Sequence, residues 1–141
     1  MKRLVLNSLL SVSLLLSAVS SSAQTVYPSA DGQRARYSAY IELPQAYVSG
    51  ICVLLNDGGV VKGSFFNEFG LTALDFTYCP QRQKVKLHSV VAMMDKWYIR
   101  RVLRKDLAQL MQRLQQGETQ YCNERRHITY QFTPIADEVT Q

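Results

Sequence analysis

The chain of 141 residues contains 47% hydrophobic and 19% charged residues and has a formal net charge of +5. This length fits one domain of ordinary size, which can bury a core without a metal or many disulfides. The sequence contains no internal repeat, low-complexity tract or glycine-rich phosphate loop. It therefore excludes a repeat protein and offers no nucleotide-binding motif.

The first 23 residues have the pattern of a secretory signal peptide. Lys2 and Arg3 precede a serine-rich apolar run that is too short for a transmembrane helix, and small residues end at Ala23. The first cysteine is Cys52, so no lipobox follows the run. We predict cleavage near Ala23 and a soluble periplasmic protein, rather than a retained N-terminal anchor. Loss of the two cations lowers the formal charge from +5 by two, to +3, and we expect no nucleic-acid partner.

Five β-strands are predicted in the first part of the mature chain. Residues 24–35 are polar and are expected to form a flexible leader. Alternating apolar and polar residues then predict strands, with Asn, Asp and Gly in the turns between them. These strands cover residues 36–43, 47–55, 60–66, 71–78 and 84–88.

The hairpin of residues 60–78 is expected to be apolar on both faces. If the alternation simply continues through each strand, one face carries Val61, Phe65, Leu71 and Ala73. The other face then carries Val60, Phe66, Leu74, Phe76 and Tyr78.

A helix is predicted for residues 96–116, with Asp95 as its N-cap and a hydrophobic staple between Met94 and Ile99. Its apolar stripe consists of Ile99, Leu103, Leu107, Leu110 and Leu114. Two further strands, residues 119–123 and 127–133, complete a single domain of residues 36–135, followed by a tail of residues 136–141.

The predicted fold class is α+β, with a curved antiparallel β-sheet, a half-open barrel, packed on one long amphipathic helix. One helix covers only one face of such a sheet. The second apolar face then either forms a groove for a lipid tail or acyl chain, or is covered by the leader or a partner subunit.

The start of the helix is rich in cations and aromatic residues. Arg100, Arg101 and Arg104 are candidates for contact with an anionic head group, because the arginine guanidinium group can form bidentate hydrogen bonds with phosphate. A solvated face balanced by distant carboxylates is the alternative. Trp97 suits either a core position or the mouth of a groove.

Catalytic and metal-binding patterns are weak in this sequence. His88 and His127 each lie within ten residues of a cysteine, Cys79 and Cys122, but no nucleophile turn surrounds either thiol. Cys79 and Cys122 are candidates for a disulfide, with three free thiols as the alternative. We predict no enzyme, no cofactor and no metal site.

The segments "NEFG" (67–70), "LDF" (74–76) and "DKWYIRRVLRKDL" (95–107) resemble small Gram-negative envelope proteins of the LolA/LolB-like lipoprotein carrier superfamily. The resemblance covers residues 37–135. It implies a curved sheet that closes over helices, an apolar cavity for acyl chains, and lipid or lipoprotein trafficking to the outer membrane without chemistry. An envelope module that docks its apolar sheet face onto another protein is the alternative function. By position, the expected groove residues are Phe65, Phe69, Leu74, Phe76 and Trp97.

Overall fold

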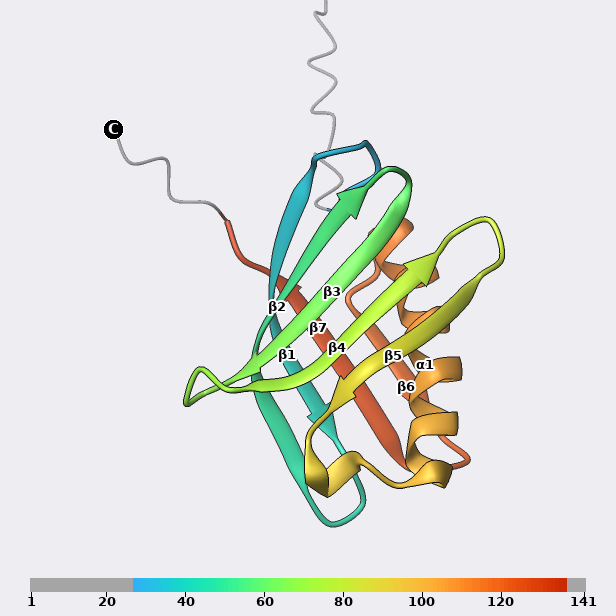
Figure 1. The fold of residues 1–141 in the computed structure, drawn as a ribbon. Coiled ribbons are helices and arrows are strands. Elements are labelled where there is room, and N and C mark those ends of the chain that lie inside the picture. The colour runs from blue at the N-terminus through green and yellow to red at the C-terminus, as the bar shows by residue number, and fades with distance from the viewer. Residues whose placement is uncertain (1–26, 137–141) are drawn as a thin grey trace, which may run out of the picture.

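A computed structural model describes residues 27–136 of the chain. Seven antiparallel strands form one sheet in the order β5-β4-β3-β2-β1-β7-β6, and a 19-residue helix packs beside it (Figure 1). The predicted α+β class with a curved antiparallel sheet is confirmed. The predicted signal peptide and residues 137–141 of the predicted tail lie outside the described residues. The elements are β1 (Arg34–Glu42), β2 (Tyr47–Asp57), β3 (Val60–Asn67), β4 (Thr72–Cys79), β5 (Lys84–Val90), η1 (Ala92–Met94), α1 (Trp97–Gln115), β6 (Gln120–Asn123) and β7 (Ile128–Pro134).

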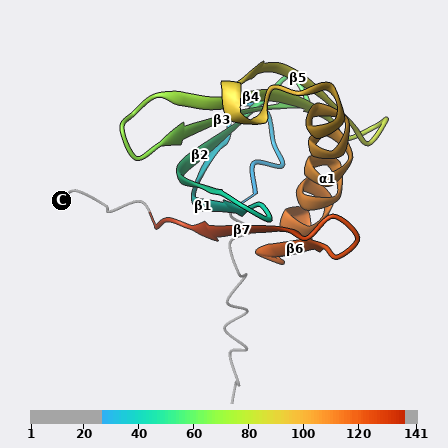
Figure 2. The ribbon, with the colours of Figure 1, turned by 90° about the horizontal axis from the view of Figure 1, so that it is seen from below.

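The sheet curls into an open half-barrel, and α1 lies in the gap between its two edges (Figure 2). β1 pairs with β2 on one side and with β7 on the other, so the last hairpin extends the sheet from β1. The two edge strands are therefore β5 and β6, and α1 contacts both. The single helix thus covers the concave side of the sheet.

The hairpin of β3 and β4 is apolar on only one face, which corrects the expectation of two apolar faces. Cross-strand pairs share a face of a sheet, and here Val61 pairs with Tyr78 and Phe65 pairs with Leu74. A register shift between Phe65 and Phe66 changes the phase of the alternation near the turn. Alternation within each strand could not reveal this register, because a shift of one residue moves side chains to the opposite face.

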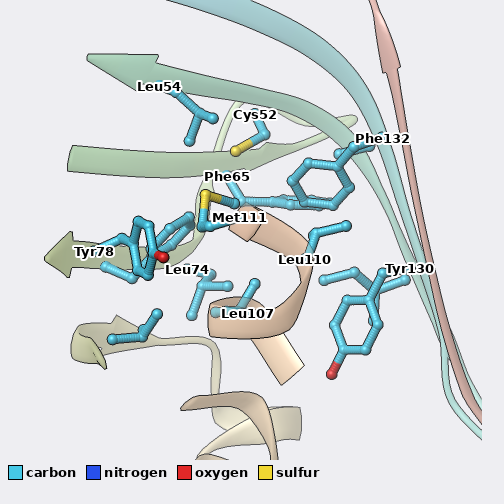
Figure 3. Close-up of a cluster of buried hydrophobic side chains, with 14 of the residues drawn as sticks. Cys52, Leu54, Phe65, Leu74, Tyr78, Leu107, Leu110, Met111, Tyr130 and Phe132 are labelled. Carbon is cyan, nitrogen blue, oxygen red and sulfur yellow. The ribbon is translucent and has the colours of Figure 1, made fainter. Parts of the chain in front are cut away.

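The core lies between α1 and the concave side of the sheet (Figure 3). The predicted apolar stripe of α1 is confirmed at four positions that are buried, while Ile99 is partly buried against the same core. Figure 3 shows Leu107, Leu110 and Met111 pointing from the helix toward side chains of the strands. Deleting one such buried side chain typically costs about 2–5 kcal/mol. The four buried positions of the stripe are Leu103, Leu107, Leu110 and Leu114.

The start of α1 differs from the predicted cap. Lys96, with φ −121° and ψ 141°, occupies the N-cap position, and no side chain caps the helix. Asp95 follows η1, and its carboxylate accepts a hydrogen bond from Arg100 at 2.8 Å. The N-cap therefore lies one residue later than predicted, and the short helical turn η1 before Asp95 was not predicted from the sequence.

The described part of the predicted leader is packed against the β2–β3 turn. Tyr27 is buried in the core. Asn56 forms hydrogen bonds with the residues that follow Tyr27. The Asn56 side chain donates to the Pro28 carbonyl at 3.0 Å, its backbone N–H donates to the Gln33 carbonyl at 2.9 Å, and its carbonyl accepts from Gly32 at 2.8 Å. β1 accordingly begins at Arg34, two residues before the predicted start of the first strand.

Candidate functional site

An apolar groove opens at the end of the half-barrel where the β1–β2 turn, η1 and the start of α1 meet. These three elements lie at the bottom of Figure 1. Its volume is about 510 Å³, within the range of small-molecule pockets. The β1–β2 turn forms one wall because Pro44 follows β1 and the Leu43 N–H donates to the Ala46 carbonyl at 2.7 Å. The apolar lining residues are Leu43, Pro44, Ala46, Met93, Ile99, Val102 and Ile128.

A basic hollow of about 530 Å³ adjoins the groove on the other side of Tyr98. The groove and the hollow share Tyr98, Val102 and Arg126 as lining residues, so they are parts of one continuous surface. One end of this surface is apolar and the other is cationic. The remaining residues of the hollow are Trp97, Arg101, Lys105, Asp106, Asn123 and Arg125.

Four cations from two elements line the basic hollow. Arg101 and Lys105 are four residues apart on α1, which places them on one face of the helix. Arg125 and Arg126 lie in the turn between β6 and β7. Within residues 27–136, none of these four side chains is in an ion pair. No acidic partner within residues 27–136 therefore neutralises their positive charge.

A buried carboxylate connects the two elements of the hollow. Asp106 of α1 is only 3% exposed and accepts hydrogen bonds from the Asn123 amide at 2.9 and 3.1 Å and from the Tyr130 hydroxyl at 2.8 Å. Asn123 in turn accepts a bond from the backbone N–H of Arg126 at 3.2 Å. Burial raises the pKa of the Asp106 carboxyl, while the bonds from Tyr130 and Asn123 act in the opposite direction.

Three of the predicted groove residues lie in the closed core. Phe65, Leu74 and Phe76 are buried on the concave side of the sheet, and none of them lines the apolar groove or the basic hollow. The sequence analysis assigned these three residues to the groove from their positions in the chain alone. In the structure, the curl of the sheet turns their side chains toward α1. In this conformation the protein's own side chains enclose them.

The other two predicted groove residues are exposed. Phe69 is 86% exposed in the β3–β4 turn and lines a further hollow of about 410 Å³, which shares Met93 with the apolar groove. Trp97 is 75% exposed and lines the basic hollow, so it is not a core residue. Its ring meets that of Tyr98 edge-on, with 5.7 Å between the centroids.

The three arginines predicted to contact a head group have different surroundings. Arg101 lines the basic hollow, whereas Arg100 pairs with Asp95 at 2.8 Å. Arg104 is exposed and does not line the hollow. Sequence reasoning counted Lys105 among the cations that crowd the first half of the helix, but it assigned no role to Arg125 and Arg126. The paired arginines in a predicted turn were a visible signal, but only the fold places this turn beside α1.

Within residues 27–136, the cysteines and histidines show no hydrogen bond to one another. Cys52, Cys79 and Cys122 are free, so the alternative of free thiols describes the structure. His88 Nε2 lies 2.6 Å from the Thr77 hydroxyl, and Cys122 Sγ lies 3.7 Å from the Thr129 hydroxyl. Within residues 27–136, no group of three or more His, Cys, Asp or Glu side chains is arranged to hold a metal.

No family model matches the chain, and neither a curated protein nor a solved structure is significantly similar to it. The open, strongly curled half-barrel with one helix has a shape compatible with LolA-like folds. In the described part of the chain, no helix combines the length and the apolar character needed to cross a membrane.

Proposed function

We propose that the protein is a non-catalytic periplasmic carrier that binds the acyl chain of a lipid or an acylated protein in the apolar groove. The observation that carries this proposal is the continuity between the groove and the basic hollow through Tyr98, Val102 and Arg126. An amphiphile can place its tail among apolar side chains and its polar end beside cations. The half-barrel shape supports a role in lipid or lipoprotein trafficking toward the outer membrane, by analogy of fold.

The apolar part of the groove can supply useful binding energy. Each buried methylene contributes about 0.8 kcal/mol, so roughly eight methylenes would contribute about 6 kcal/mol before the cost of association. Met93 is well suited to this surface, because its flexible thioether adapts to ligand shape. None of the five groove residues expected from sequence lines this groove.

A fluorescent fatty-acid analogue tests the proposal directly. The fluorescence of this probe should change when it binds to the wild-type protein. Ala46→Trp fills the groove without changing the backbone hydrogen bond between Leu43 and Ala46, so it should abolish this change. Ala30→Trp is the matched control, because Ala30 is exposed and does not line the groove. Mass spectrometry of ligands retained after mild purification should also detect an acylated molecule. A lipid-free protein that ignores the probe would refute the proposal.

Docking onto another envelope protein is a second candidate function, and the convex face of the sheet favours it. Ile51 is 44% exposed on β2, opposite Phe66 of β3. Nearby, the rings of Tyr40 and Tyr47 stack with 5.5 Å between their centroids. Ile51→Lys should then remove a protein partner found by crosslinking in cells, whereas Ala46→Trp should leave it in place.

A further inference from the structure

We propose that the basic hollow is a binding site for a phosphate monoester group, either on a lipid head group or on a small soluble molecule. If the phosphate belongs to the head group of a lipid whose tail lies in the groove, this inference rests on the function proposed above. The phosphate site itself can be tested without any lipid, because its cations do not line the apolar wall of the groove, apart from Arg126.

The charge in the hollow suits a dianion. Arg101, Lys105, Arg125 and Arg126 line it, and the carboxylate of Asp106 is the one acidic group among its lining residues. A phosphate monoester carries close to two negative charges at neutral pH and has three terminal oxygens. A phosphodiester carries one charge. The monoester therefore matches the surplus of cations more closely.

The geometry of the cations suits phosphate recognition. Three of the four are arginines, whose planar guanidinium groups can each donate two parallel hydrogen bonds to phosphate oxygens. Arg101 and Lys105 approach the hollow from α1, and Arg125 and Arg126 approach it from the β6–β7 turn. A ligand held between two elements is reached by donors from different directions.

Hydrogen bonds hold these two elements together before a ligand arrives. Asp106 of α1 bonds to Asn123 at the end of β6, and Asn123 accepts the backbone N–H of Arg126. Tyr130 of β7 donates to the same carboxylate. Because Asp106 accepts its hydrogen bonds from Asn123 and Tyr130, it sets the position of the arginine turn. Within residues 27–136, no acidic side chain forms an ion pair with the four cations. Asp106 is thus a positioning residue.

The first experiment measures the binding of glycerol 3-phosphate by calorimetry. Arg125→Gln/Arg126→Gln should weaken binding roughly tenfold or more, since hydrogen bonds to a charged group are lost. Arg34→Gln/Arg82→Gln is the control, because it removes the same charge at exposed positions outside the hollow. An equal loss in both variants would mean diffuse electrostatic attraction and would overturn the site. Binding of a phosphodiester or of sulfate as tight as that of the monoester would overturn the proposed class of ligand.

The second experiment separates the two sources of the phosphate group. Phosphatidylcholine vesicles containing phosphatidic acid present a monoester, and vesicles containing phosphatidylglycerol present a diester. Capture by phosphatidic acid, lost in Arg125→Gln/Arg126→Gln, supports a lipid head group. Binding of glycerol 3-phosphate without vesicle capture supports a soluble ligand, and binding of neither refutes the inference. Ala46→Trp should keep glycerol 3-phosphate binding, so failure of the groove and failure of the hollow give different results.

Discussion

The buried hydroxyl of Tyr130 donates a hydrogen bond to Asp106 Oδ2 at 2.8 Å and so joins β7 to α1. Figure 3 shows the Tyr130 oxygen pointing away from the apolar cluster in which its ring packs. Asp106 is one of the two buried polar residues in the described part of the chain. The pair places a polar contact directly behind the basic hollow.

The Tyr130–Asp106 bond should be visible in a double-mutant cycle. Tyr130→Phe removes one donor to a buried carboxylate, and Asp106→Asn removes an acceptor needed by both Tyr130 and Asn123. Each change should lower the free energy of unfolding by about 1–3 kcal/mol. Urea denaturation of the double variant should show a coupling of about 0.5–3 kcal/mol. Strict additivity of the two losses would mean that the bond contributes nothing.

The stability of the protein should also depend on pH through Asp106. Burial raises the pKa of this carboxyl above its ordinary 3.8, so the folded state holds the proton more tightly than the unfolded chain does. The stabilising contribution of Asp106 is therefore complete below pH 3.8 and is lost as the pH rises through the folded-state pKa.

Asp106→Asn does not titrate at this position and provides the comparison. Denaturation curves at a series of pH values should show the wild type losing stability relative to Asp106→Asn as the pH rises above 3.8. A relative gain for the wild type over the same range would mean that the hydrogen bonds from Tyr130 and Asn123 outweigh burial.

Gly63 should be required by the ring that covers it. A Cβ at Gly63 would lie 2.3 Å from the ring of Phe76, the residue that pairs with it across β3 and β4. Gly63→Ala should therefore destabilise the protein by about 1–3 kcal/mol through overpacking. Adding Phe76→Leu to this variant should cost less than Phe76→Leu costs alone. Thermal or urea denaturation of the wild type, the two single variants and the double variant tests this. If the losses of stability in the two single variants simply add in the double variant, the predicted contact is contradicted.

The three thiols should differ in reactivity. Cys122 is exposed, whereas Cys52 is completely buried, and burial raises the pKa of its thiol. An alkylating reagent should label Cys122 in the native protein and Cys52 only after unfolding, because the thiolate is the reactive form. Peptide mass spectrometry can locate each label. Labelling of neither Cys79 nor Cys122 in the native, non-reduced protein would indicate that these two form a disulfide.

Local patterns were sufficient to predict the seven strands and α1, although not η1. Alternation and turn residues placed each strand within a few residues, and the spacing of Leu103, Leu107, Leu110 and Leu114 gave the buried face of the helix. These features depend on neighbours close in the chain, whose period is fixed by strand or helix geometry. The same reasoning indicated the α+β class with a curved antiparallel sheet, which the structure confirms.

Only the tertiary structure decided which apolar residues are enclosed and which cations meet. The register of β3 and β4 turned Phe65, Leu74 and Phe76 to the same side, where α1 covers them. The pairing of β7 with β1 brought the β6–β7 turn beside the first half of α1, so Arg126 and Arg101 line one hollow although they lie far apart in sequence. Such placements depend on strand order and register, which arise from contacts between distant segments and leave no periodic trace in the sequence.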